Sequence, residues 1–251
     1  MKKLFFFIYV LSTAFLVAQT NSQQLFEKAN TSYKEGNYQE AVNLYQEIEA
    51  KDSISSTLFY NLGNAYYKLN NVANTIYYFE KALILDPLNK DAANNLQFAK
   101  RMTIDNIEDI PLTFLQRMEA NYLQKFSYNQ WAMISVAFSF LAAILFLLFY
   151  FSDISSKKRV YFLTSVLSFF LLITSFAITY NQYQKSSTTT YAIIFSSKVS
   201  VNNAPTQNSE EIFVLHEGTK VNILDTLDNW KKIKLADGKI GWIIANALKE
   251  L

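Results

Sequence analysis

Two long stretches of the chain contain only uncharged and mostly apolar residues. Residues 131–151 and 160–180 each run for 21 positions without an Asp, Glu, Lys, Arg or His. An α-helix rises ~1.5 Å per residue, so ~20 apolar residues cross the hydrocarbon core of a bilayer. Aromatic residues stand at the ends of both stretches, as interfacial side chains do, namely Trp131, Tyr150, Tyr161 and Tyr180. The pattern predicts a two-helix transmembrane hairpin.

The residues around this hairpin predict its orientation. The connecting loop, residues 152–159, carries Lys157, Lys158 and Arg159, and short basic loops remain in the cytoplasm. Both flanks of the hairpin are then periplasmic. Residues 1–18 agree, because a cationic start followed by a short apolar run is typical of a secretory signal peptide; an uncleaved anchor is the alternative. We therefore expect an inner-membrane protein whose folded parts lie in the periplasm.

Residues 22–89 show helical periodicity and repeat every 34 positions. Block 22–55 aligns with block 56–89 without a gap, so that Ala29 matches Gly63 and Tyr45 matches Phe79. The spacing and residue types resemble the tetratricopeptide repeat (TPR), in which small residues let paired helices approach and aromatic residues fill the gap. Because two repeats leave an apolar end, residues 90–101 are expected to form a capping helix. The prediction is an α-helical TPR solenoid over residues 22–101.

A second helical pattern lies between this region and the hairpin. Residues 112–126 place apolar side chains at mostly helical spacing after a break at residues 105–111. An amphipathic juxtamembrane helix at the membrane surface fits this pattern. Packing of the same helix against the TPR domain is the alternative.

The periodicity changes from 3.6 to 2 in the C-terminal part, residues 190–251. Short strand-like runs alternate with turns such as Asp237-Gly238, a combination that predicts a small all-β barrel. The runs are Tyr191–Phe195, Val199–Val201, Ile212–Leu215, Lys220–Leu224, Trp230–Leu235 and Ile240–Ile244. The runs Trp230-x-x-Ile233-x-Leu235 and Gly241-Trp242-Ile243 resemble the bacterial SH3 pattern. That family usually has an arginine where this chain has Asn202. Trp230 and Trp242 are candidates for a ligand shelf on the barrel, although such tryptophans are often part of the core.

Composition excludes several kinds of chemistry. The chain has no cysteine and one histidine, His216, and its net charge is only +2. Thiolate sites, His-rich metal sites and a basic stripe for nucleic acid are therefore absent from the sequence. No serine is adjacent to His216, and the five glycines form no phosphate-binding cluster. We expect a protein that is not an enzyme, binds no cofactor, metal or nucleic acid, and acts by interaction.

The first helix of each predicted repeat supplies the candidate binding surface. By TPR register these helices line the concave face, and several residue types recur at the 34-residue offset. Amides and lysines can bond a peptide backbone or a carboxylate, and tyrosines add contact area. The candidates are Asn30, Tyr33, Lys34, Tyr60, Asn61, Asn64, Tyr67 and Lys68. Some TPR proteins clamp a terminal carboxylate with two asparagines and three cations; here Phe26, Asp91 and Asn95 occupy the cation positions, so we expect no such clamp.

The order of the parts carries a further resemblance. A signal peptide, two TPRs ending in Leu83-x-Leu85-Asp86-Pro87, Asn129-Gln130-Trp131 at the start of a membrane hairpin, and a terminal SH3-like domain together resemble BatE, of the Bacteroides aerotolerance (Bat) family. The resemblance implies membrane partners with von Willebrand A domains, a MoxR-type ATPase system, and a role in oxidative stress tolerance or envelope maintenance.

Two functions follow from these expectations. In the first, the chain is an inner-membrane adaptor or scaffold that presents its TPR and SH3-like modules to partner proteins. In the second, it is a cell-wall sensor or anchor whose SH3-like domain binds peptidoglycan.

Overall fold

The computed structural model describes residues 22–51, 53–108 and 110–251. The predicted signal peptide, residues 1–18, lies outside the described residues. The chain forms two compact units. The first unit contains residues 22–85, 89–108 and 191–251, and the second contains residues 86–88 and 110–190. The predicted TPR and SH3-like modules thus belong to one compact unit, which the sequence did not indicate.

The helical part of the first unit follows the period of the repeat. Residues 22–34 are helical. The two turns between paired helices contain Gly36 and Asn70, which are equivalent positions of successive repeats and both have positive φ angles, 84° and 57°, a conformation that glycine and asparagine tolerate best. The further helices are α2 (Tyr38–Glu49), α3 (Ser56–Lys68), α4 (Val72–Leu85) and α5 (Lys90–Lys100).

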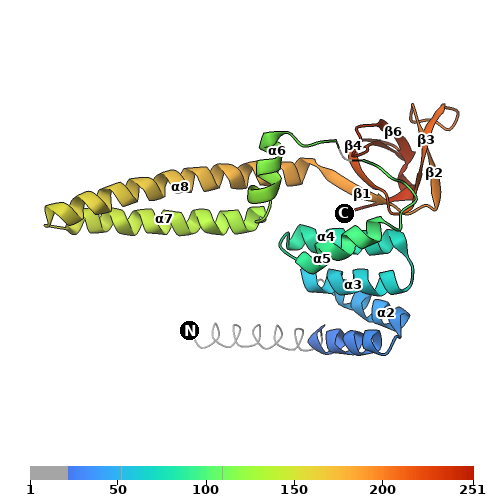
Figure 1. Cartoon of the computed structure of the whole chain (residues 1–251), viewed down its shortest axis with the longest axis horizontal. Coiled ribbons are helices and arrows are strands. Elements are labelled where there is room, and N and C mark those ends of the chain that lie inside the picture. Colours follow the sequence, from blue (N-terminus) through green and yellow to red (C-terminus); the bar gives the residue numbers. More distant parts are fainter. Residues whose placement is uncertain (1–21, 52, 109) are drawn as a thin grey trace, which may run out of the picture. The chain divides into compact units, whose positions relative to one another are not determined.

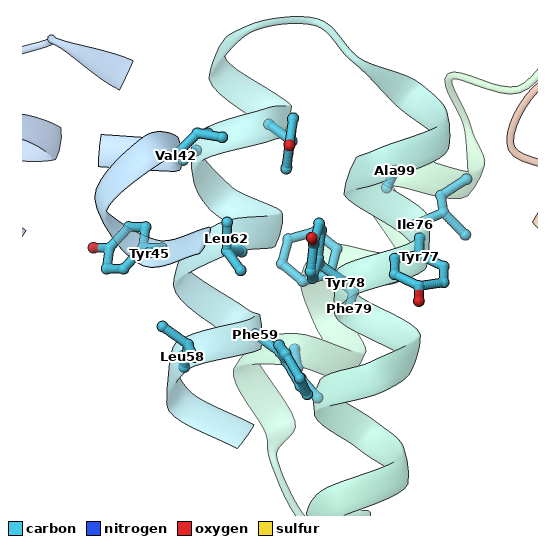
Figure 2. Packing of buried hydrophobic residues seen from close by; sticks show 14 of the residues in the cluster. Val42, Tyr45, Leu58, Phe59, Leu62, Ile76, Tyr77, Tyr78, Phe79 and Ala99 are labelled. Carbon is cyan, nitrogen blue, oxygen red and sulfur yellow. The ribbon is translucent and has the colours of Figure 1, made fainter. Parts of the chain in front are cut away.

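The core of these helices contains the small and aromatic residues of the repeat. Ala29, Tyr45 and Phe79 are at most 1% exposed. At Gly63 a Cβ atom would lie 2.5 Å from Cδ1 of Phe79, so only glycine allows α3 and α4 to pack at this distance. Figure 2 shows the buried side chains that α2, α3 and α4 contribute to this cluster.

Helix α5 continues the repeat rather than only covering its end. Its N-cap Asn89 accepts a hydrogen bond from the amide of Ala92, as Ser55 does from the amide of Leu58 at the equivalent place in the preceding repeat. The buried side chains of α5 occupy the positions of buried side chains in α3. These pairs are Leu58 and Ala92, Leu62 and Leu96, and Ala65 and Ala99. α5 is therefore the first helix of a third repeat.

The C-terminal segment forms one antiparallel sheet with the strand order β3-β2-β6-β5-β4-β1-β7. The strands overlap the predicted runs, except for β7, which the sequence did not indicate. The predicted closed barrel is wrong, because β7 pairs with β1 and β3 with β2, and the two edge strands share no ladder. The strands are β1 (Thr190–Ile194), β2 (Lys198–Asn202), β3 (Glu211–His216), β4 (Lys220–Leu227), β5 (Trp230–Lys234), β6 (Ile240–Ile244) and β7 (Leu248–Glu250).

A half-buried carboxylate joins the sheet to the segment that follows α5. Asp105 accepts hydrogen bonds from the backbone N of His216 at 2.7 Å and from Oγ1 of Thr219 at 2.6 Å, and its other oxygen lies 2.7 Å from Nδ1 of His216. Burial alone would raise the pKa of Asp105, but these hydrogen bonds outweigh it and lower the pKa below its ordinary value of 3.8. Asp105 is therefore a carboxylate at neutral pH and binds the β3–β4 turn.

Helix α4 provides the other half of this junction. Glu80, which is 6% exposed, binds Nζ of Lys220 at 2.7 Å. The ring of Phe195 meets the ring of Tyr77 edge-on with centroids 5.8 Å apart. Ile193 is fully buried in the same apolar cluster as the TPR core. The sheet thus covers the outer side of the last complete repeat.

The second unit contains two long apolar helices, α7 (Tyr128–Phe151) and α8 (Ser155–Thr188), each long and apolar enough to cross a membrane. They lie side by side (Figure 1), and the hydroxyls of Ser135 and Ser175 are 2.9 Å apart between them. α8 extends beyond the predicted span at both ends, so residues 152–154 alone separate the helices.

The segment before α7 is not the single helix expected over residues 112–126. A short helix α6 (Phe114–Met118) continues as a π-helix, η1 (Glu119–Leu123). As the last residue of η1, Leu123 has a carbonyl without an intrahelical partner. This carbonyl accepts hydrogen bonds from Nε1 of Trp131 at 2.9 Å and from Nε2 of Gln182 at 2.8 Å. The segment is therefore bonded to both long helices at the open end of the hairpin.

Candidate functional site

The predicted binding asparagines are brought together in a repeated arrangement. Nδ2 of Asn61 donates to Oδ1 of Asn30 at 3.1 Å, and Nδ2 of Asn95 donates to Oδ1 of Asn64 at 2.8 Å. Both members of the first pair stand exactly one repeat before their counterparts in the second, so one amide–amide bond links each first helix to the next. We call the surface that carries these four amides, on residues 22–34, α3 and α5, the amide face.

A tyrosine from the core orients one end of the amide face. The hydroxyl of Tyr45 donates to Oδ1 of Asn30 at 2.6 Å. Burial raises the pKa of Tyr45 to about 12, so this hydroxyl keeps its proton at neutral pH and acts as a donor. Oδ1 of Asn30 therefore accepts two hydrogen bonds, and the Nδ2 group of this amide faces away from both donors. Within the described residues no protein acceptor is recorded for Nδ2 of Asn30 or Nδ2 of Asn64.

Some of the remaining predicted residues pack against other side chains, and the others are exposed. Tyr33 is half-buried and meets Tyr38 edge-on at 5.3 Å, and burial raises its pKa above the ordinary value. Tyr60 packs against Phe79, with centroids 6.0 Å apart. Tyr67 is 41% exposed. Lys34 and Lys68 are exposed. The side chains with room to contact another molecule are thus those of Tyr67 and the two lysines.

The sequence reasoning missed the part of this surface that α5 supplies. Asn95, Phe98 and Arg101 are the equivalents, one repeat later, of Asn61, Asn64 and Tyr67. Phe98 is 54% exposed, and Cζ of Arg101 lies 5.3 Å from the centroid of its ring. The 34-residue period could have identified these residues as equivalents of the candidate binding residues. They were not among the candidates because α5 was expected to be only a capping helix.

The two candidate tryptophans share one face of the sheet. Trp230 pairs with Ile244 and Trp242 with Lys232 across β5 and β6, which places all four side chains on the face opposite the buried Ile233. Both tryptophans are half-buried, and Nζ of Lys232 is 5.8 Å from the Trp242 ring. This face is an aromatic surface with a cation beside it.

His216, the single histidine of the chain, lies at the end of β3. Its side chain is 24% exposed and held by Asp105. The hydroxyl nearest to the pair, that of Thr219, donates to Asp105 and not to the imidazole, so it is not activated as a nucleophile would be. Among the residues that the structure describes, no group of three or more Asp, Glu and His side chains is arranged to hold a metal ion.

Comparison with known proteins identifies two parts of the chain. Residues 56–89 match the tetratricopeptide repeat family model, and residues 197–249 match the bacterial SH3 domain model. No curated protein matches the chain.

Two solved structures are similar to part of the chain. The Arabidopsis OM64 TPR domain is 25% identical with a TM-score of 0.33, over 34% of this chain and 69% of that one. The first TPR domain of Spaghetti (RPAP3), bound to the HSP90 peptide SRMEEVD, is 23% identical with a TM-score of 0.31, over 43% of this chain and 75% of that one. Together with the geometry of the repeats and the sheet, the family matches show that this chain contains a tetratricopeptide repeat and a bacterial SH3 domain.

Proposed function

We propose that this protein is a membrane-tethered adaptor that holds an extended segment of a partner protein on the amide face. The tether raises the effective concentration of whatever is bound, and no chemical step is required. In this proposal the chain is not an enzyme, and the SH3-like domain offers a second contact for a partner or the cell wall.

The observation that carries the proposal is the repetition of the amide–amide bond. Asn61 with Asn30 and Asn95 with Asn64 make the same contact at successive repeats. The bond spaces amide groups regularly along one surface, and regularly spaced donors and acceptors suit an extended peptide backbone. Within the described residues the contacts of the sheet fall on α4 and on the segment from Thr103 to Ile107, and not on the four asparagines of the amide face.

Chain connectivity supports the proposed topology. The chain leaves the first unit after residue 108, passes through α7 and α8, and returns to the same unit at residue 191. A hairpin whose two ends join one compact unit must begin and end on one side of a membrane. With the basic residues Lys157, Lys158 and Arg159 on the opposite, cytoplasmic side, both folded domains would lie in the periplasm at the inner membrane.

The partners in this proposal come from the resemblance to the Bat family. They are membrane proteins with von Willebrand A domains and a MoxR-type ATPase system, in a complex linked to oxidative stress tolerance or envelope maintenance. A second function, anchoring to or sensing of peptidoglycan, is favoured by the aromatic face of Trp230 and Trp242 with Lys232 beside it. Sedimentation of the full-length protein with purified sacculi, with and without Trp242→Ala, tests that alternative.

Crosslinking in native membranes tests the adaptor. The full-length protein is crosslinked in cells and purified, and its partners are compared with those of a Tyr67→Ala/Lys68→Ala variant, which changes two exposed side chains of the amide face. Tyr191→Ala, which changes a 43% exposed tyrosine outside the amide face, is the matched control. We expect the same envelope proteins with the wild type and the control and their loss from the double variant. Equal recovery from all three proteins would contradict the proposal.

Single introduced cysteines test the topology, because the chain has none of its own. A membrane-impermeant maleimide should label Ser53→Cys and Asn208→Cys from one side and Ser156→Cys only from the other. Labelling of Ser156→Cys and Asn208→Cys from the same side would contradict the proposed transmembrane hairpin.

A further inference from the structure

The short helix and the π-helix that precede the hairpin carry a row of exposed apolar side chains. Phe114, Met118 and Tyr122 follow one another at four-residue intervals along α6 and η1, and all three are exposed. Over eight residues a continuous α-helix would place Tyr122 about 80° around the axis from Phe114. The i→i+5 bond of the π-helix, here from the amide of Gln124 to the carbonyl of Glu119 at 3.0 Å, gives a wider turn that brings Tyr122 back toward the line of Phe114. We call these three side chains the apolar stripe.

A different side of this segment is attached to the hairpin. The carbonyl of Leu123 accepts hydrogen bonds from Trp131 in α7 and Gln182 in α8. Glu119 forms an ion pair with Lys185 of α8. Because α8 extends beyond these contacts, α6 and η1 lie beside the hairpin, and Figure 1 shows α6 running across it. These bonds use no residue of the apolar stripe, so the stripe remains exposed along the outer side of the segment.

The same contacts fix the level of the segment along the hairpin. Trp131 is the first residue of one uncharged stretch, and Gln182 stands two positions after the last residue of the other. At ~1.5 Å per residue, Gln182 is about 3 Å beyond the end of the apolar span, which is the depth of the headgroups in a bilayer. The ring of Phe126 meets the ring of Trp131 edge-on with centroids 5.6 Å apart. In a hairpin that crosses a membrane, the segment therefore borders the headgroups of one leaflet.

A polar row with two cations runs beside the apolar stripe. Arg117, Asn121 and Lys125 each stand one residue before an apolar side chain, and all three are exposed. Nζ of Lys125 is 5.7 Å from the centroid of the Tyr122 ring, and Nε of Arg117 donates to the carbonyl of Leu112 at 3.3 Å. An apolar side with Lys and Arg beside it is typical of helices that lie in the membrane interface, where long cationic side chains reach the phosphates.

We propose that α6 and η1 form a lipid-binding surface, in which the apolar stripe inserts among phospholipid headgroups and Arg117 and Lys125 meet their phosphates. The sequence left open whether residues 112–126 contact the membrane or the TPR domain. The attachment of the segment at the headgroup level, next to the lipid-facing surface of α7 and α8, favours the membrane. The inference rests on the proposed function in one point, that the hairpin crosses a membrane, and it adds the chemical class of a ligand.

Quenching of a fluorescent probe by spin-labelled lipid tests this surface. Phe114→Cys and Tyr122→Cys supply single thiols, since the chain has no cysteine, and each is labelled with NBD. The full-length protein is reconstituted into vesicles of phosphatidylcholine and phosphatidylglycerol. Gln124→Cys is the matched control, because Gln124 is exposed and lies two residues after Tyr122, on another side of the segment. We expect a spin label near the headgroup to quench both stripe probes roughly three-fold more than the control, as insertion by 5–10 Å requires.

A charge substitution tests the contact with phosphates. Lys125→Gln removes one cation near an anionic surface and should lower the ratio of inserted to non-inserted Tyr122→Cys probe roughly five-fold, as read from the two fluorescence lifetimes. Lys198→Gln changes an exposed lysine of the sheet and should leave this ratio unchanged. An equal ratio in the two variants would overturn the role of the cations.

A probe in the middle of α7 separates this inference from the proposed function. Ile144 is exposed, and Ile144→Cys should be quenched by a spin label deep in the acyl chains. Quenching there, with stripe probes quenched no more than Gln124→Cys, would overturn the lipid-binding surface and leave the hairpin intact. A blue-shifted stripe probe that lipid does not quench would assign the stripe to a protein contact, with the TPR domain or a second copy, and would also overturn it. Absence of quenching at Ile144→Cys as well would contradict the transmembrane hairpin and with it both proposals.

Discussion

The junction between the repeats and the sheet depends on one carboxylate, and replacing Asp105 by alanine should open it. The replacement removes two hydrogen bonds to backbone and hydroxyl donors and a contact with Nδ1 of His216, all at 2.6–2.7 Å. Hydrogen bonds to a charged group contribute about 1.5–3 kcal/mol each, while burial of the carboxylate costs part of that gain. We therefore expect the junction to lose about 3 kcal/mol, which corresponds to an opening equilibrium roughly 100-fold larger.

Hydrogen exchange of the full-length protein in detergent measures this change. The amide of Gly218 donates to the carbonyl of Ile194 at 2.8 Å, and the amide of Ile194 donates to the carbonyl of Thr219 at 2.9 Å. Both amides are protected only while the turn is in place, so both should exchange roughly 100-fold faster in the variant. The α3 amides should be less affected, because the TPR core does not depend on Asp105.

An aspartate elsewhere in the sheet is the matched control. Asp237 accepts a hydrogen bond from the amide of Lys239 at 3.0 Å in the β5–β6 turn, and among the described residues its bonds are to Lys239 and not to the helices. Asp237→Ala should leave the exchange of Gly218 and Ile194 unchanged. Less than a three-fold change on Asp105→Ala, or an equal change on Asp237→Ala, would refute the reasoning.

Acid should have the same effect as the substitution. Because the pKa of Asp105 in the folded protein lies below 3.8, its contribution is complete at neutral pH and is lost as the pH falls through that lower value. In the wild type the exchange of Gly218, corrected for its intrinsic rate, should therefore rise only below pH 3.8. A rise that begins near pH 6 would implicate a different group.

Three further experiments test the core, the hairpin and the dependence of stability on alkaline pH. Gly63→Ala places a Cβ 2.5 Å from Cδ1 of Phe79 and should cost about 1–3 kcal/mol in urea unfolding, with partial recovery when Phe79→Leu is added; an unchanged midpoint would contradict the close packing. A double-mutant cycle of Ser135→Ala and Ser175→Ala in detergent should give a coupling of about 0.6 kcal/mol, and zero coupling would mean that their contact contributes nothing. Since the pKa of Tyr45 is raised to about 12 from 10.0, its contribution is complete below pH 10 and lost as the pH approaches 12. Tyr45→Phe should therefore reduce the fall in unfolding free energy between pH 10 and 12, and an identical pH dependence would refute this assignment.

Local sequence determined the elements of this protein. The 34-residue period predicted the paired helices, because each position of a repeat has the same neighbours as its equivalent; Gly36 and Asn70 even share the left-handed conformation. The change of period from 3.6 to 2 located six of the seven strands. The two uncharged stretches predicted α7 and α8, since length and hydropathy suffice to recognise such helices.

The candidate site was predictable only where the repeat was recognised as binding surface. Asn30, Asn61 and Asn64 were identified by register, and the structure brings them together. Phe98 and Arg101 were not identified, because the sequence shows no second helix of a repeat after α5 and this helix was expected to be a cap. The packing of Tyr33 against Tyr38 and of Tyr60 against Phe79 could not be predicted. The positions of the rings of Tyr38 and Phe79 follow only from the fold.

Tertiary structure alone decided how the parts combine. Asp105 and His216 are 111 residues apart, and nothing in the local pattern of either segment indicates that a carboxylate will meet that turn. The open sheet likewise depends on which strands pair with one another. The periodicity of a strand predicts that it is a strand, but not which other strand it pairs with. Periodicity reports the neighbours of a residue along its own helix or strand, whereas long-range contacts depend on the shapes of two surfaces that form only when the chain has folded. For this reason the sequence predicted two separate interaction modules, and the folded protein contains one compact unit built from both.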